Sequence, residues 1–359
     1  MNTIKSFSVG YNPINKHNIF SSGEGINGQV TLELSKDCQV KSFCIKLKGK
    51  AEVKWTENHG KNSTTYHNKE KYFSIKQFIF HTGQGNQLIN QGCHVYPFSF
   101  YIPTQELPSS FKGAHGKILY TLEANLSRSM RLDSKAKAEF TLMHKANLDS
   151  DPRLKAPQHS IVDKKMSLFN SGSVSMDVNI DRTGYYQGEG MKVVASIENR
   201  SSREIKPKYS LNAKYSYFAK SKRKIQLKEI LKEVGEVVPP SASQTVTKII
   251  HIPPELHVSV HNCSILKVEY RLKVYLDVKY ASDPEIKFPI IILPAIARPE
   301  VQDSDFPASG FEAFPQPDMF GGPSLFQNPT ATGPSAPPPP YETYGMYPSL
   351  GGFNQNTYQ

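Results

Sequence analysis

The chain has 359 residues, and 38% of them are hydrophobic, which is enough to form a core in each of two domains. A single domain of this length would be unusual. No apolar run approaches the length of a membrane span, and the N-terminus lacks the apolar segment of a signal peptide, so we expect a cytoplasmic protein. The formal charge of +11 is unevenly distributed: six acidic residues and no Lys or Arg follow Arg298, which leaves +17 on the preceding body. A basic body favours anionic partners, such as a membrane surface or acidic and phosphorylated peptides, and no nucleic-acid-binding motif accompanies the charge.

Segments of the N-terminal half that are rich in β-branched and aromatic residues, separated by turn residues, predict β-strands. In the last of them apolar and polar side chains alternate, which predicts one buried and one solvated face. The predicted strands are 28–34, 40–49, 72–80, 96–102 and 117–127.

The stretch 149–172 mixes Asp, Pro, Lys and Ser without clean periodicity, and we interpret it as an interdomain linker. The clearest strand comes later, where apolar residues alternate with polar ones from Leu266 to Tyr280. A period of two held over fifteen residues excludes a helix, whose apolar stripe would have a period of 3.6. The length of this strand also predicts a bend or β-bulge within it.

The two halves of the chain repeat one another. Gly-Glu-Gly precedes a strand at 23–25 and again at 188–190, and Ile-Pro precedes another strand at 102–103 and at 252–253. Because the order and approximate spacing are kept, we expect an all-β fold with two copies of one immunoglobulin-type β-sandwich. The predicted domains are 1–148 and 173–298, with the linker 149–172 between them and a tail at 299–359.

The last 61 residues contain twelve of the 26 prolines, and Gly, Ser and Gln fill much of the remainder. Such a composition cannot offset the loss of conformational entropy by forming a core. We therefore expect a disordered tail.

The four cysteines show neither CxxC spacing nor His-rich neighbours, which predicts reduced thiols in the core and not a zinc site or disulfides. We expect no metal and no cofactor. No enzyme is expected either, because the sequence contains no nucleophile elbow, phosphate-binding loop or zinc-protease motif. The cysteines are Cys38, Cys44, Cys93 and Cys263.

Five segments resemble the arrestin fold, and in particular the α-arrestins, the arrestin domain-containing proteins with Pro-rich tails. The resemblance implies two concave sandwiches that bind membrane receptors or transporters as cargo. It also implies a tail that recruits HECT-type ubiquitin ligases through their WW domains, at the plasma membrane and endosomes. The segments are 20–30 (FSSGEGINGQV), 45–55 (IKLKGKAEVKW), 184–190 (GYYQGEG), 197–203 (IENRSSR) and 262–270 (NCSILKVEY).

A Pro-Pro-x-Tyr motif is complete at Pro338, Pro339 and Tyr341. Consecutive prolines hold this segment in a polyproline II helix before a partner binds, so little ordering entropy is lost. Three residues per turn place Pro338 and Tyr341 on one edge, as the aromatic grooves of WW domains require. The alternative is a stiff spacer whose tyrosine has no role. The α-arrestins often carry two such motifs, and with only one we expect weaker ligase binding.

Pro334, Ser335, Ala336 and Pro337 match the late-domain signal that the ESCRT-I complex recognises. Four residues in a proline-rich tail also arise by chance. Because this match adjoins the WW ligand, we expect a ligase and ESCRT-I to compete for the segment.

Tyr347 and Leu350 fit the Tyr-x-x-Φ sorting pattern, which clathrin adaptors recognise by strand addition. Asp305 and Phe306, with Phe311 and Phe314 further on, form a second candidate adaptor contact. The alternative is that scattered Phe and Tyr in a disordered tail match these patterns by chance.

The densest positive run is a candidate site for anionic lipid headgroups or phosphorylated cargo. The alternative is a solvated loop between strands, which is the usual setting of such a run. The run contains Lys220, Lys222, Arg223 and Lys224, with Lys214 and Lys228 nearby.

The sequence therefore predicts a non-enzymatic trafficking adaptor that binds membrane cargo and recruits a WW-domain ubiquitin ligase for cargo ubiquitination, endocytosis and endosomal sorting. Since the tail has no lysine, a ligase docked there would modify the body or the cargo. Two alternatives stay open: a sorting or ESCRT-linked budding scaffold that works without ubiquitin, and a peripheral lipid-binding module.

Overall fold

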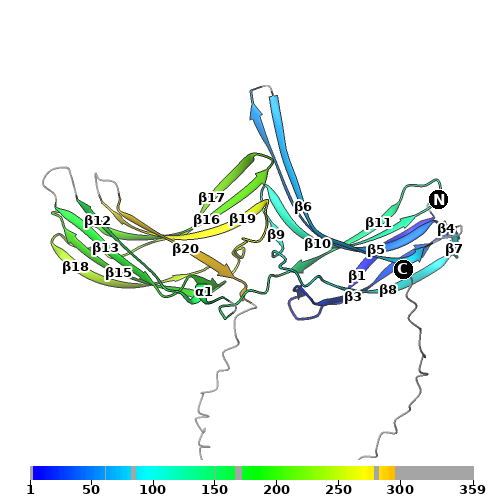
Figure 1. The fold of residues 1–359 in the computed structure, drawn as a ribbon, viewed down its shortest axis with the longest axis horizontal. Helices are drawn as coiled ribbons and strands as arrows, with labels where there is room; N and C mark the ends of the chain where they lie inside the picture. The colour runs from blue at the N-terminus through cyan, green and yellow to red at the C-terminus, as the bar shows by residue number, and fades with distance from the viewer. Residues whose placement is uncertain are drawn as a thin grey trace, which may run out of the picture. The chain divides into compact units, whose positions relative to one another are not determined.

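The computed structural model describes residues 3–60, 62–81, 86–149, 151–165, 172–278 and 283–295. Within these ranges the regular structure consists of β-strands and one four-residue helix, α1 (Pro152–Lys155). The strands form two sandwiches, one before and one after this helix in the chain (Figure 1). The predicted all-β fold with two sandwich domains is confirmed. The predicted tail, 299–359, lies outside the described residues.

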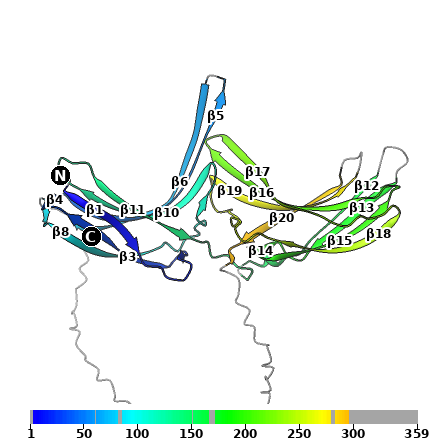
Figure 2. The same cartoon turned by 180° about the vertical axis from the view of Figure 1, so that it is seen from behind.

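The first sandwich has a three-stranded and a six-stranded sheet. Its strands are β1 (Ile4–Tyr11), β2 (Ile19–Phe20), β3 (Gly25–Leu34), β4 (Cys38–Val40), β5 (Ser42–His59), β6 (Asn62–His81), β7 (Gln87–Ile89), β8 (Gly92–Tyr101), β9 (Phe111–Lys112), β10 (Gly116–Ser127) and β11 (Ser134–Leu142). The smaller sheet has the order β1-β3-β8, and the larger has the order β2-β11-β10-β5-β6, with β9 beside β10. β4 and β7 pair with each other in a separate two-stranded sheet. Figure 2 shows β3 and β8 below β10 and β11, so the core lies between these layers.

The second sandwich repeats this plan with nine strands. They are β12 (Gln158–Lys165), β13 (Ser173–Ile180), β14 (Gly184–Tyr186), β15 (Gly190–Arg200), β16 (Lys206–Ala219), β17 (Lys222–Val234), β18 (Ala242–His251), β19 (Leu266–Asp277) and β20 (Glu285–Leu293). One sheet has the order β12-β13-β15-β18 and the other β14-β20-β19-β16-β17.

The predicted linker, 149–172, contains more regular structure than its composition indicates. It includes α1, whose first turn is capped by the Asp151 side chain, and the whole of β12. β12 pairs with β13 along its full length, and its residues are alternately exposed and half-buried. Because few of those half-buried residues are apolar, the sequence carried no period-two signal for this strand.

The alternation in β10 is only partly reflected in burial. Ile118, Tyr120 and Leu122 face the core as expected, but Leu119 and Thr121 on the opposite face are buried as well. They lie opposite Lys50 and Lys48 of β5, and the apolar stems of such side chains cover a neighbouring strand. The prediction of a fully solvated second face was therefore wrong.

β19 is twelve residues long and contains no β-bulge; the other expected irregularity, a bend, stays a prediction. Its ladders with β16 and β20 keep a constant register. The irregularity lies one strand further, between β16 and β17, where the register shifts at Leu211 and Asn212. An edge strand accommodates an extra residue more easily than a strand that is paired on both sides.

Three of the cysteines, Cys38, Cys44 and Cys263, are buried free thiols, as predicted. Cys93 is also free, but it is exposed on β8, so its predicted core position was wrong.

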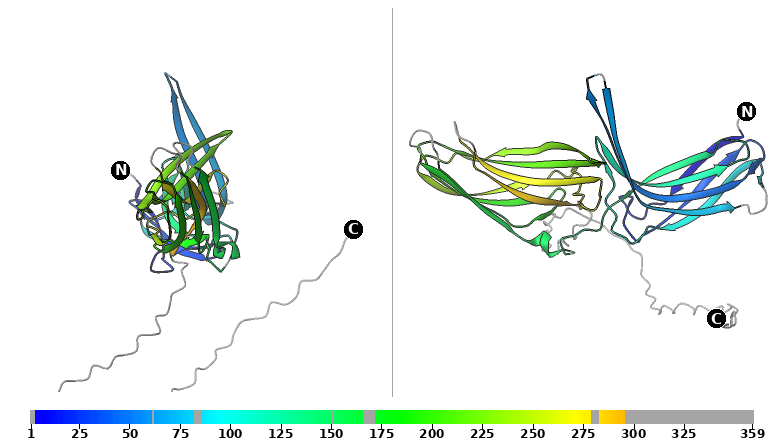
Figure 3. Two further views of the ribbon diagram at one scale, coloured as in Figure 1. Left: turned by 90° about the vertical axis from the view of Figure 1, so that its left-hand side faces the viewer. Right: turned by 45° about the horizontal axis from the view of Figure 1, so that its top comes forward.

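The strands β5 and β6 continue beyond the rest of their sheet. β10 pairs with β5 only as far as Val53, so the distal part of β5, from Lys54 onward, pairs with β6 alone. Figure 3 shows this part as a projecting hairpin. An isolated two-stranded ribbon is marginally stable, and here Trp55 supports it by stacking on Tyr66 at a ring-centroid distance of 5.3 Å.

Candidate functional site

The outer face of the larger sheet in the first sandwich is rich in lysine. In β5 the apolar residues Leu47, Ala51 and Val53 are fully buried, and alternate positions between and beside them point away from the core. The β5 register aligns those positions with outward-facing residues of β6 and β10, and β11 continues the rows beyond β10. We call this surface the lysine face; its residues are Lys46, Lys48, Lys50, Lys54, Lys69, Lys71, Lys76, Lys117, Lys135 and Lys137.

Carboxylates neutralise only part of the lysine face. Glu52 accepts from His67 and pairs with Lys50 and Lys69 at 3.4 and 3.7 Å, and Glu123 pairs with Lys48 at 2.7 Å. Burial raises the pKa of Glu52, but the hydrogen bond from His67 and the two lysines outweigh burial and hold that pKa below its usual value. Both carboxylates are ionised at neutral pH, because hydrogen bonding to Lys48 likewise outweighs burial and lowers the pKa of Glu123.

Several lysines of this surface have no anionic partner. Among the described residues, Lys46, Lys54, Lys71, Lys117 and Lys135 form no ion pair. The Lys76 ammonium lies 3.8 Å from the ring centroid of Phe78, a cation–π contact that leaves its charge uncompensated. The lysine face is therefore positively charged and open to an anionic ligand.

The predicted basic run lies on a β-hairpin and its turn. Lys220 occupies the turn between β16 and β17 with a positive φ of 56°, and β17 begins at Lys222. Lys214 pairs with Glu269 at 3.1 Å and Lys224 pairs with Glu57 of β5 at 3.4 Å. The solvated-loop interpretation therefore applies only to the turn.

The alternation of β17 separates the basic side chains onto two faces. Lys224 and Lys228 lie opposite Tyr217 and Ala213, which are buried in the core. Arg223 lies on the other face, where it donates to Ser216 Oγ at 2.9 Å. Lys214, Lys220, Lys222, Arg223, Lys224 and Lys228 thus do not converge on a single headgroup pocket.

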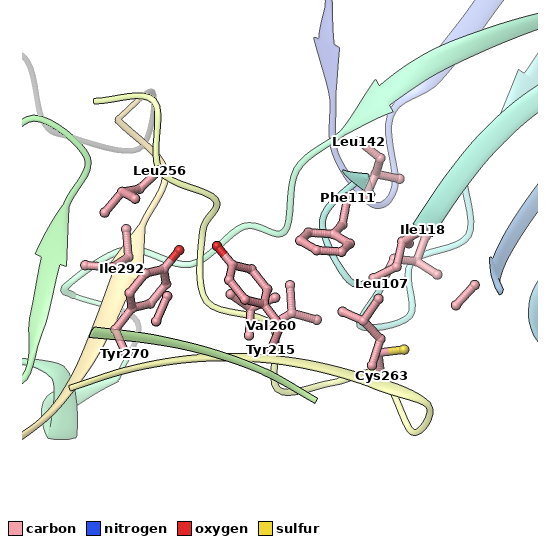
Figure 4. Packing of buried hydrophobic residues seen from close by; sticks show 14 of the residues in the cluster. Leu107, Phe111, Ile118, Leu142, Tyr215, Leu256, Val260, Cys263, Tyr270 and Ile292 are labelled. Atoms are coloured by element: carbon pink, nitrogen blue, oxygen red, sulfur yellow. The ribbon is translucent and has the colours of Figure 1, made fainter. Parts of the chain in front are cut away.

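The two sandwiches contact one another near the β16–β17 hairpin. Glu70 of β6 accepts hydrogen bonds from the backbone N–H of Ser264 at 3.0 Å and from its hydroxyl at 2.8 Å. Phe111 of β9 packs against Tyr215 of β16 at a ring-centroid distance of 6.1 Å (Figure 4). Phe111 also packs against His257 at 4.7 Å. Polar and aromatic contacts together join the sandwiches.

The described ranges contain no cluster of three or more His, Cys, Asp or Glu residues that could hold a metal ion. Nor does the described part contain a helix long and apolar enough to cross a membrane.

The predicted tail motifs lie outside the described residues and stay predictions. They are the WW ligand at Pro338, Pro339 and Tyr341, the late-domain match at Pro334, Ser335, Ala336 and Pro337, and the sorting signal at Tyr347 and Leu350.

The sequence did not lead us to predict the lysine face, although it contains part of the pattern that produces this surface. Lys46, Lys48 and Lys50 alternate with apolar or small residues within a predicted strand, which places them on one face. Their alignment with Lys71 and Lys76 depends on the β5–β6 register, and that register includes two irregularities. Periodicity within one strand cannot reveal such an alignment.

Comparison with known proteins identifies both sandwiches. Residues 7–149 match the arrestin (or S-antigen) N-terminal domain, and residues 170–295 match the arrestin (or S-antigen) C-terminal domain. Arrestin domain-containing protein 4 of Homo sapiens is 30% identical over 284 residues, which cover 76% of this chain and 68% of that protein. Thioredoxin-interacting protein of Rattus norvegicus is 29% identical over 296 residues, which cover 80% of this chain and 74% of that protein.

Proposed function

This chain belongs to the arrestin family, as an arrestin domain-containing protein of the α-arrestin type, and we propose from that premise that it is a trafficking adaptor. Its sandwiches bind membrane receptors or transporters as cargo, and its tail recruits a WW-domain HECT-type ubiquitin ligase. Cargo is then ubiquitinated, endocytosed and sorted at endosomes. The two matched domains belong to a fold family whose members are generally non-enzymatic adaptors.

The lysine face is the observation that carries the cargo-binding half of this proposal. Its unpaired ammonium groups attract acidic or phosphorylated cytosolic segments and raise the rate of encounter with them. The same charges favour a position near an anionic leaflet, where each contributes about 1 kcal/mol. We therefore place the protein in the cytoplasm, peripherally at the plasma membrane and endosomes.

The tail motif supports the ligase half. Pro338, Pro339 and Tyr341 form a complete WW ligand in a segment without acceptor lysines. About 40 residues separate Arg298 from Pro338, and a flexible chain of that length has a root-mean-square reach of about 35 Å. A ligase held at Tyr341 can therefore reach lysines of a bound cargo.

Binding of a peptide spanning 324–350 to an isolated WW domain tests the ligase half directly. We expect micromolar binding that is lost with Tyr341→Ala and kept with the matched control Tyr347→Ala. In cells, Tyr341→Ala in the full chain should abolish cargo ubiquitination while leaving cargo association intact. Equal WW-domain binding by all three peptides would contradict ligase recruitment through this motif.

The late-domain match supports a second candidate function, an ESCRT-linked budding scaffold. Pro334, Ser335, Ala336 and Pro337 would bind ESCRT-I, and the adjoining WW ligand makes the two partners competitors. Cargo budding that survives Tyr341→Ala but is lost with Pro334→Ala would favour this function. Tyr347 and Leu350 would add a clathrin-adaptor contact, which Leu350→Ala should weaken.

A further inference from the structure

β17 is an exposed edge strand. It ends the order of its sheet, so one side pairs with β16, while the other side pairs with no strand of the described chain. Most of its thirteen residues are exposed. An edge of this kind presents a row of backbone N–H and C=O groups that a further strand can bind.

A β-bulge divides this edge into two parts. Asn212 pairs with Glu229 but Leu211 pairs with Leu231, so Ile230 is the extra residue. Bulges twist a strand and interrupt regular pairing. The regular part, residues 222–229, is called the β17 edge below.

Large apolar side chains are exposed on one face of the β17 edge. Ile225 is 47% exposed and Leu227 is 74% exposed, and they lie two positions apart on the same face. Natural edge strands usually carry charged residues at such positions because exposed apolar edges promote association. Charged residues flank Ile225 and Leu227 on the β17 edge but do not replace them, so an added strand would find two neighbouring aliphatic side chains there.

The opposite face of the β17 edge is basic. Lys224 and Lys228 lie on it, two positions either side of Gln226. The β17 edge as a whole has four cations, including Lys222 and Arg223, and one anion, Glu229. A strand that binds there meets Lys222, Lys224 and Lys228 on one face. On the other face it meets Ile225 and Leu227, with Arg223 and Glu229 at the two ends.

We propose that the β17 edge binds an extended segment of a partner protein by strand addition, and that the segment alternates acidic and aliphatic residues. Side chains of neighbouring strands lie side by side on each face, so the aliphatic residues pack beside Ile225 and Leu227. The acidic residues lie beside Lys222 and Lys228, on the same face as Lys224, whose ammonium pairs with Glu57. This inference rests on the proposed cargo-binding function and specifies a second cargo contact, separate from the lysine face.

The geometry favours a peptide over a bilayer. A flat membrane contacts one face of a strand, whereas Lys222, Lys224 and Lys228 lie on the face opposite Ile225 and Leu227, and Arg223 is the one cation of the β17 edge on the aliphatic face. A membrane surface also offers no backbone to pair with the free N–H and C=O groups. An added strand satisfies both requirements.

The test uses the full chain and a fluorescent octapeptide of four Glu-Val repeats. The control peptide has the same composition in two blocks, four Glu followed by four Val, so it retains the charge but not the alternation. Fluorescence anisotropy should show about tenfold tighter binding of the alternating peptide. Deuterium exchange should show new protection of the amides of residues 222–229 when that peptide binds.

Variants locate the site. Ile225→Asp with Leu227→Asp should weaken the alternating peptide about tenfold, and exposure of both side chains predicts an unchanged melting temperature. The matched control is Ile249→Asp on β18, an edge strand of the other sheet, where the native Ile is 44% exposed; this change should leave peptide binding unaltered.

Four results would overturn the proposal. Two concern the peptides: equal affinity for both of them, or no change in deuterium exchange at residues 222–229. The other two would assign the β17 edge to a different partner: vesicles of phosphatidylserine whose binding the double variant abolishes without any effect on peptide binding, or a dimer of this chain that the double variant dissociates. WW-domain binding should be normal in the double variant. If the double variant loses cargo ubiquitination while its WW-domain binding stays intact, the defect lies at the β17 edge. If the Tyr341 experiment fails, only ligase recruitment is contradicted.

Discussion

The larger sheets of the two sandwiches have similar strand plans but differ in how far carboxylates pair with their lysines. On the first, lysines outnumber the carboxylates and several have no ionic partner among the described residues. On the second, three lysines pair with carboxylates of neighbouring strands, and hydrogen bonding to Lys208 holds the pKa of Asp277 below its usual value. The pairs are Lys208 with Asp277 at 2.5 Å, Lys214 with Glu269 at 3.1 Å and Lys273 with Glu285 at 2.9 Å.

This difference shows that net charge alone does not mark a binding surface. Both sheets are lysine-rich, yet three lysines in the central strands of the second sheet pair with its carboxylates, whereas five lysines of the first sheet form no ion pair among the described residues. The edge strand β17 of the second sheet keeps a positive excess. An anionic ligand gains most where the protein has not already supplied the counter-charge. The first sheet is therefore the better candidate for electrostatic capture, and the second sandwich contributes through the β17 edge.

Disrupting the contact between the sandwiches should give the largest effect. A Cβ at Gly116 would lie 2.8 Å from Leu266 and 2.9 Å from both Tyr217 and Val53, all of them buried. Gly116→Val should lower the free energy of unfolding by about 2 kcal/mol through overpacking, measured by urea denaturation. Gly10→Ala is the control, since a Cβ there meets nothing within 4 Å. Equal stability of the Gly116 variant and the native chain would show that the two sheets do not depend on this contact.

The charge comparison itself is tested by neutralising lysines in each sheet. Lys46→Gln with Lys71→Gln should weaken binding of a decaglutamate peptide about tenfold and reduce its salt dependence. The matched change in the second sheet, Lys214→Gln with Lys273→Gln, should leave that affinity nearly unchanged. This change should instead lower the free energy of unfolding by at most about 1 kcal/mol for each ion pair that it removes. Equal loss of affinity in both variants would contradict the comparison.

Removing a single polar contact between the sandwiches should have a smaller effect. Ser264→Ala deletes the hydroxyl that donates to Glu70 at 2.8 Å but keeps the backbone N–H bond. We expect a loss of about 1 kcal/mol in the free energy of unfolding, measured by urea denaturation. Ser63→Ala, at an exposed position on β6, should cost less than half of that. If the two variants were equally stable, the Glu70 contact would not contribute to docking of the sandwiches.

The smallest expected effect is a dependence of stability on pH that arises at the contact between the sandwiches. Burial lowers the pKa of His257, and the nearby Lys228 lowers it further, so folding favours the neutral ring. The stability that His257 contributes is therefore complete above its unfolded pKa of about 6.5 and is lost as the pH falls below that value. His257→Gln should flatten the fall in melting temperature between pH 7 and 6, whereas His17→Gln should not. An identical slope in the native chain and the His257 variant would exclude this residue as the cause.

Local periodicity was sufficient to identify the strands and the repeat of two sandwiches. The alternation from Leu266 to Asp277 specifies a β-strand because the two-residue period arises within a single chain segment. The Gly-Glu-Gly and Ile-Pro repeats likewise lie in the sequence itself. By contrast, β12 could not be recognised, because only its pairing with β13 makes a polar segment into a strand.

The amino-acid order thus decided the fold class, the two-domain plan and which residues of each strand share a face. The tertiary structure decided which faces become surfaces of one charge. Lys46 lies beside Lys76, and Lys50 beside Lys71, only because β5 and β6 pair in one specific register. The tertiary structure also decided that the basic run of β17 is split between two faces beside an unpaired edge. The physical reason is that side-chain alternation is a property of one strand, whereas charge pairing and edge exposure depend on which strands lie next to each other.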